Sequence, residues 1–150
     1  MKKIILVSGI QNSGKSNTIG LLYESLVKIN PSHTFNDSHA KSSQIKFPIG
    51  KNEDFSAIFN LKEYFRIGLL SCGDDLDMFK TDFSYIKDDI DVLICASRSK
   101  NADGSVYKFI TEEMPSNGFL LQLNLSTFPT DNLTEMQRNI VNAILKFLNL

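Results

Sequence analysis

The stretch SGIQNSGKSNT, residues 8–18, lies between the apolar run 4–7 and a segment with helical spacing. Every position of the run is apolar, as expected of a strand that is buried on both faces. After the stretch, apolar residues recur every three or four positions, which predicts a helix that Asn30-Pro31 ends. A strand, a glycine-containing loop and a helix in this order form the first part of a βαβ unit. The apolar face of the helix is Ile19, Leu22, Tyr23, Leu26 and Ile29.

The rest of the chain continues to alternate between short β-rich runs and segments with helical spacing. A hairpin is expected where two extended runs are joined by residues 62–65. We therefore predict a single α/β domain over residues 1–150, with three layers. Its mainly parallel sheet should have about five strands, one of them an antiparallel hairpin strand, and helices should cover both faces of the sheet. Further strands are expected at 55–61, 66–71, 92–95 and 119–125, with a candidate short strand at 33–36. Further helices are expected at 76–86, 106–110 and 133–148. Candidate caps of the last helix are Thr134 with Gln137, or Asp131.

Composition restricts the class of protein. The chain has 150 residues, 42% of them hydrophobic, and a formal net charge of -1. No apolar run approaches the roughly 18 residues of a membrane span, and no basic field indicates nucleic-acid binding. We expect a cytoplasmic protein with no membrane partner, because no secretory signal is evident and there are two cysteines. Cys72 and Cys95, both placed at strand ends, are expected to be buried and inert.

Residues 9–16, Gly-Ile-Gln-Asn-Ser-Gly-Lys-Ser, match the Walker A pattern G-x-x-x-x-G-K-[ST] at every fixed position. Glycines let successive N–H groups point at one anion, and the start of a helix adds its dipole. Lys15 is expected to contact the β- and γ-phosphates, and the Ser16 hydroxyl to ligate Mg²⁺. The alternative is an ordinary glycine turn with an exposed lysine. The predicted nucleotide-binding residues are Gly9, Gln11, Asn12, Ser13, Gly14, Lys15, Ser16 and Asn17.

On this motif the chain resembles the P-loop NTPase superfamily. It is most similar to small bacterial P-loop proteins without an assigned reaction, in which a Gly-Asp pair follows one strand and an Ala-Ser-Arg turn follows the next. Here these are Gly73-Asp74 and the turn at 96–98. The resemblance implies a mainly parallel sheet flanked by helices, and ATP and Mg²⁺ as ligands.

A second acidic residue, at the end of a neighbouring strand, commonly helps to hold Mg²⁺ in such proteins. Here Asp74 arrives one position after the glycine that follows the apolar run, so it departs from the usual pattern. Asp74, expected to act on the metal and in catalysis, and Asp75 both follow a strand, where open α/β sheets bind ligands. Their alternative role is to cap the next helix. Asp37 is a third candidate, either as a contact to an acceptor hydroxyl or as a turn former.

Arg98 follows another buried strand at the same predicted edge of the sheet. Its guanidinium is suited to stack on a base or to neutralise phosphate charge during catalysis. An exposed structural arginine is the alternative, and Lys100 presents the same choice.

The signature of guanine-specific GTPases is absent at both positions where it is expected. Leu70 stands three residues before Gly73 in place of an aspartate, and residues 97–100 read Ser-Arg-Ser-Lys in place of Asn-Lys-x-Asp. ATP is therefore favoured over GTP.

The first functional hypothesis is an enzyme that binds ATP·Mg²⁺ and hydrolyses or transfers the γ-phosphoryl group. If it is a small-molecule or nucleotide kinase, the acceptor should lie near residues 32–50. The second hypothesis is a non-catalytic switch in which nucleotide orders residues 36–54 and 97–104 for a protein partner.

Overall fold

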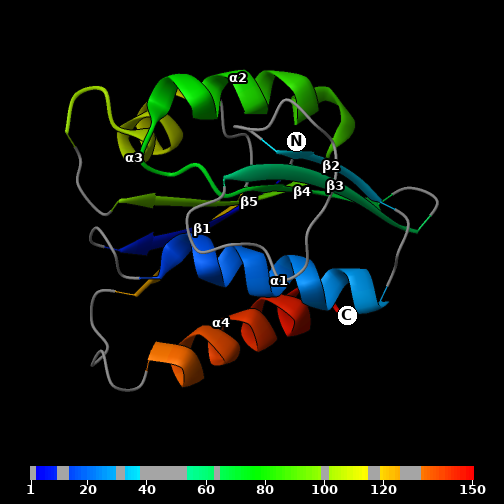
Figure 1. The fold of residues 1–150 in the computed structure, drawn as a ribbon. Helices are drawn as coiled ribbons and strands as arrows, with labels where there is room; N and C mark the ends of the chain where they lie inside the picture. Colours follow the sequence, from blue (N-terminus) through cyan, green and yellow to red (C-terminus); the bar gives the residue numbers. More distant parts are fainter. Residues whose placement is uncertain are drawn as a thin grey trace.

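A six-stranded sheet lies between two layers of helices (Figure 1). The computed structural model describes residues 3–9, 14–29, 33–37, 54–62, 65–98, 102–114, 119–125 and 133–150. The strands are β1 (Lys3–Gly9), β2 (His33–Asp37), β3 (Phe55–Lys62), β4 (Phe65–Leu70), β5 (Val92–Arg98) and β6 (Phe119–Asn124). The helices are α1 (Lys15–Ile29), α2 (Leu76–Ile86) with the short η1 (Lys87–Asp89), α3 (Val106–Lys108) with its π-helical continuation η2 (Phe109–Glu113), and α4 (Leu133–Phe147).

The strand order across the sheet is β2-β3-β4-β5-β1-β6. Strand β3 is antiparallel to both of its neighbours, and the pairs β4–β5, β5–β1 and β1–β6 are parallel. The predicted hairpin and the mainly parallel sheet are therefore confirmed. The short strand at the edge, β2, brings the strand number to six, compared with the expected five or so.

Alternation along β1 distributes its side chains between two cores. Ile5 and Val7 pack with apolar side chains of α1 and α4, whereas Ile4 and Leu6 pack with those of α2 and α3. Because successive strand residues point to opposite faces, a run that is apolar throughout must be covered on both sides. Helices on both faces of the sheet, as predicted, supply that cover (Figure 1).

The region predicted as a turn at 96–98 is part of a strand. Strand β5 continues through Arg98, where Ser97 and Arg98 pair with Ser8 and Gly9 of β1. The parallel ladder with β1 extends the strand beyond its apolar residues. A prediction from apolar residues alone therefore placed the end of this strand too early. For the same reason Cys95 lies inside β5 and not at its end.

Two details of the helices also differ from the expectations. Ile29 is 49% exposed, because it is the last residue of α1 and extends beyond the packed face. Helix α4 begins at Leu133, so Thr134 lies inside the helix and is not its cap, and Asp131 lies outside the described residues.

Within the described part of the chain, no helix is long and apolar enough to cross a membrane.

Candidate functional site

The start of α1 is held by the carbonyl of Gly14. This glycine has a φ of 88°, in the left-handed region that side chains disfavour. Its oxygen accepts hydrogen bonds from the Thr18 backbone N–H at 2.9 Å and the Thr18 hydroxyl at 2.8 Å. A third donor, the Gln137 side-chain amide, lies at 3.0 Å. The predicted binding residues Gln11, Asn12 and Ser13 lie outside the described residues, whereas Gly9 ends β1 and Asn17 lies in the first turn of α1.

Lys15 is the first residue of α1, and its side chain is only 5% exposed. Its Nζ lies 3.9 Å from Asp74 Oδ1. Burial lowers the pKa of Lys15; the Asp74 carboxylate opposes this shift and the Arg98 guanidinium adds to it. The predicted alternative of an exposed lysine on a glycine turn is therefore wrong for this side chain.

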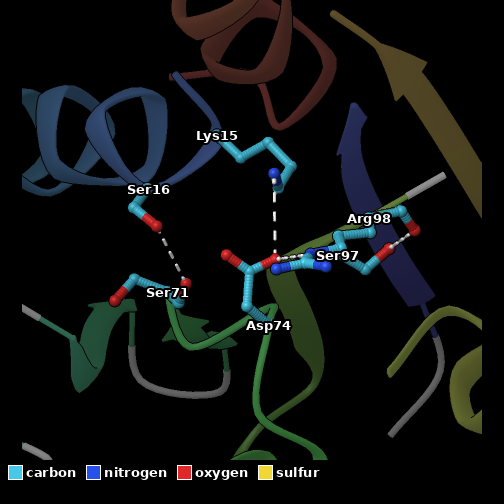
Figure 2. Close-up of polar contacts among 6 residues, drawn as sticks. All are labelled: Lys15, Ser16, Ser71, Asp74, Ser97 and Arg98. Atoms are coloured by element: carbon cyan, nitrogen blue, oxygen red, sulfur yellow. Dashed lines mark hydrogen bonds and ion pairs between the residues drawn. The ribbon is translucent and has the colours of Figure 1, made fainter. Parts of the chain in front are cut away.

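Arg98 reaches the same carboxylate oxygen from the end of β5. Its Nε donates to Asp74 Oδ1 at 2.8 Å, and the two side chains are 43% and 50% exposed. Ion pairs as exposed as this one contribute about 1 kcal/mol or less. The ion pair therefore adds little stability, but it shows where the side chains lie. Three residues predicted for the site, Lys15, Asp74 and Arg98, converge on one point (Figure 2).

The close approach of Gly73 to β5 brings Asp74 to this point. Strand β4 is not a neighbour of β1, because β5 lies between them. The turn after β4 passes over the end of β5, where a Cβ on Gly73 would lie 2.3 Å from the Ala96 carbonyl oxygen. Only a residue without a side chain fits there without a shift of backbone. Asp74 can consequently reach Lys15 although a whole strand separates β4 from β1.

The two neighbouring aspartates have different roles. Asp75 is the N-cap of α2, and its side chain accepts a hydrogen bond from the Met78 N–H at 3.0 Å. Asp74 turns to Lys15 and Arg98. Asp75 therefore takes the capping role, whereas the role of Asp74 at the metal and in catalysis stays a prediction.

Replacing Asp75 with alanine should lower the free energy of unfolding by about 1 kcal/mol, because it removes the side-chain cap of α2. Asp74→Asn should lower it by less, because the Asp74 carboxylate is half exposed and its shorter ion pair is with the similarly exposed Arg98. Urea denaturation of both variants and the wild type measures this difference. An equal or reversed order of the two losses would contradict the assignment of the cap to Asp75.

A second polar group at this edge of the sheet is centred on Ser71. The Ser16 hydroxyl donates to the Ser71 carbonyl at 3.3 Å (Figure 2). The Ser71 hydroxyl accepts from the Phe55 N–H at 2.9 Å and donates to Asp54 Oδ1 at 3.4 Å. Sequence reasoning missed Ser71 and Asp54 as members of this group. Antiparallel pairing of β3 with β4 was the available signal, because it places the start of β3 beside the end of β4.

The oxygens of Ser16 and Asp74 suit Mg²⁺ in chemical type, since this ion takes oxygen ligands and needs only one or two from the protein when phosphates supply others. In the structure the Ser16 hydroxyl is hydrogen-bonded to the Ser71 carbonyl. The Asp74 carboxylate is paired with the side chains of Lys15 and Arg98. No group of three His, Cys, Asp or Glu side chains suited to a metal occurs among the described residues.

Asp37 closes β2 at the outer edge of the sheet. Its backbone pairs with that of Phe55 at the start of β3, and the Phe55 N–H donates to the Ser71 hydroxyl of the second polar group. Lys100 and most of segment 32–50 lie outside the described residues.

The two cysteines are buried, as predicted. Burial raises the pKa of the Cys72 thiol, with the Asp82 and Asp54 carboxylates adding to the shift, and burial alone raises that of Cys95. The Cys72 thiol donates to Asp82 Oδ2 at 3.5 Å. Thiols with raised pKa values are poor nucleophiles near neutral pH, so both cysteines have a packing role.

Stability should depend on pH through Lys15. Its pKa in the folded protein lies below the ordinary value of 10.5, so between these two values the unfolded chain binds more protons than the folded chain. The free energy of unfolding of the wild type should therefore rise, relative to that of Lys15→Met, as the pH is raised towards 10.5. Urea denaturation of both proteins at each pH measures the difference. A change in the opposite direction would contradict the lowered pKa.

Comparison with family models, with curated proteins and with solved structures finds no match for this chain.

Proposed function

We propose that this chain is a P-loop protein that binds ATP·Mg²⁺ at the start of α1 and hydrolyses or transfers the γ-phosphoryl group. The observation that carries the proposal is the position of Lys15, which is almost fully buried and is the first residue of a helix that follows a central parallel strand. An ammonium removed from water is costly unless an anion compensates it. The Asp74 carboxylate is one such anion, and a nucleotide phosphate would stabilise the ammonium more strongly because it carries more charge.

The roles of the side chains follow from their positions. Lys15 and Arg98 provide two positive charges at one point, where charge on the transferring phosphoryl group requires neutralisation. Ser16 and Asp74 supply the oxygens that would hold Mg²⁺, which neutralises charge on the β- and γ-phosphates when it is bound. Catalysis by these residues is positioning and electrostatics, because phosphoryl transfer needs little covalent chemistry from the protein.

In hydrolysis, the oxygen of water forms a bond to the γ-phosphorus. The bond from that phosphorus to the β,γ-bridging oxygen breaks, and ADP leaves with the bonding electron pair. Inorganic phosphate and a proton complete the balance. In a kinase, an acceptor hydroxyl replaces the water.

Nucleotide binding is tested by unfolding the protein with and without ATP·Mg²⁺ and GTP·Mg²⁺. A ligand present at about 100 times its dissociation constant should add roughly 2.7 kcal/mol to the free energy of unfolding. We expect stabilisation by ATP·Mg²⁺. Stabilisation by neither nucleotide would overturn the proposal, and stabilisation by GTP·Mg²⁺ alone would overturn the choice of base.

The reaction is tested by measuring phosphate release from ATP and transfer to a panel of small hydroxyl acceptors. Turnover of ATP by the wild type above that of Lys15→Met supports an enzymatic function. Stabilisation by ATP·Mg²⁺ with no turnover in either assay would overturn the enzymatic half of the proposal and favour a nucleotide-dependent switch.

A further inference from the structure

Gln137 connects the last helix to the start of the first across 123 positions of sequence. The residue lies in the second turn of α4 and is 6% exposed. Its Nε2 donates to the Gly14 carbonyl at 3.0 Å. Helices α1 and α4 pack side by side on one face of the sheet, so the amide is held in place by the surrounding core (Figure 1).

The Gly14 carbonyl occupies a special position in the loop. Because a trans peptide is planar, the carbonyl of Gly14 and the N–H of Lys15 point in opposite directions. The carbonyl accepts the Thr18 N–H of the first helical turn, so it points along α1. The Lys15 N–H consequently points out of the amino end of the helix, where the helix dipole favours an anion.

A glycine peptide at positive φ has little intrinsic resistance to rotation, because no side chain restricts it. The φ of Gly14 is 88°, and a donor from outside the helix opposes rotation of the peptide that follows it. Thr18 belongs to α1 itself and therefore moves with the helix. Gln137 is the donor that ties this carbonyl to a different element.

We infer that Gln137 is a positioning residue for phosphate binding, which holds the Gly14–Lys15 peptide so that the Lys15 N–H faces the bound phosphate. The inference rests on the proposed function for the identity of the anion. Gln137 acts through the Gly14 carbonyl, so its contribution should be the same for any ligand that has the same phosphate group.

The test uses Gln137→Met, which keeps the length of the side chain and removes the donor. Binding of ATP·Mg²⁺ and of inorganic pyrophosphate·Mg²⁺ is measured by titration calorimetry. We expect both dissociation constants to rise by about 5- to 10-fold, the range expected for one buried hydrogen bond. Gln122→Met is the matched control: it makes the same chemical change on β6, where the amide donates to the Ser8 hydroxyl at 3.0 Å and not to a loop carbonyl.

A spectroscopic readout separates positioning from general stability. The ¹⁵N shift of an amide responds to hydrogen bonding at the carbonyl of the preceding residue, so the Lys15 amide signal of the ligand-free protein should move in Gln137→Met and remain in place in Gln122→Met. If the methionine variant does not fold, Gln137→Asn takes its place, because it shortens the side chain by one methylene. This variant should move the same signal.

The outcomes distinguish this inference from the proposed function. If the wild type binds neither ligand, the proposed function fails, while the Lys15 signal still reports whether Gln137 sets the peptide. Wild-type affinities in Gln137→Met would overturn the inference and leave the proposed function standing. A loss of affinity for ATP without a loss for pyrophosphate would also overturn it, because Gln137 would then act on the nucleoside.

Discussion

Replacing Lys15 with methionine is expected to weaken ATP·Mg²⁺ binding about 100-fold, because the variant loses a charged hydrogen-bond donor to the phosphates. At a concentration that gives the wild type about 2.7 kcal/mol of stabilisation, the variant should gain only about 0.4 kcal/mol. Turnover should fall by a further factor, since loss of one electrostatic donor commonly costs about 100- to 1,000-fold in rate. Urea denaturation with and without nucleotide, and an assay of phosphate release, measure the two effects.

Two comparisons keep this result from being mistaken for misfolding. Without ligand, the free energy of unfolding of Lys15→Met near neutral pH should not be lower than that of the wild type, because the lowered pKa means that the buried ammonium opposes folding there. Lys87→Met makes the same change on an exposed lysine of η1 and should leave nucleotide stabilisation unchanged. Wild-type stabilisation by ATP·Mg²⁺ in Lys15→Met would be incompatible with the proposed site.

Replacing Gly73 with alanine should destabilise the protein and displace Asp74 from Lys15. The added Cβ would meet the Ala96 carbonyl oxygen at 2.3 Å, and neither backbone can avoid this contact without a shift. Overpacking of this kind costs about 1 to 3 kcal/mol. Urea denaturation measures the loss, and the affinity for ATP·Mg²⁺ of the folded variant should fall with it, because Asp74 is one of the candidate Mg²⁺ ligands.

Gly20→Ala is the matched control for this substitution. Gly20 lies inside α1 and is buried, yet a Cβ added there meets nothing within 4 Å. Alanine is the better helix former by about 0.5 to 1 kcal/mol, so this variant should be more stable than the wild type. If Gly73→Ala were as stable as Gly20→Ala, the turn after β4 would not depend on its contact with β5.

Local patterns in the sequence were sufficient to place the helices and strands. The run at 4–7 indicated a strand buried on both faces, and the spacing after the glycine loop indicated α1, because both patterns depend on residues a few positions apart. Ends of elements were less well predicted where long-range pairing decides them. The extension of β5 through Arg98 depends on its ladder with β1, almost 90 residues away in sequence, as the pairing of Arg98 with Gly9 illustrates.

For the candidate site, residue type was enough to predict Lys15, Asp74 and Arg98 as members. Ligands bind at the carboxyl ends of the strands in open α/β sheets, so these residues were expected to lie close together. Residue type could not separate Asp74 from Asp75, because either carboxylate is suited to cap a helix. It also gave no indication of Gln137 as a donor to the loop, since the Gly14 carbonyl and α4 are distant in sequence.

By itself the sequence determined an α/β pattern and a glycine loop between a buried strand and a helix, because periodicity and turn chemistry are local properties. The tertiary structure decided that β5 lies between β1 and β4, that Gly73 lets the turn after β4 pass over the end of β5, and that Lys15 and Arg98 therefore share the carboxylate of Asp74. These features depend on the order in which strands pair, and strand order is set by packing across the whole chain.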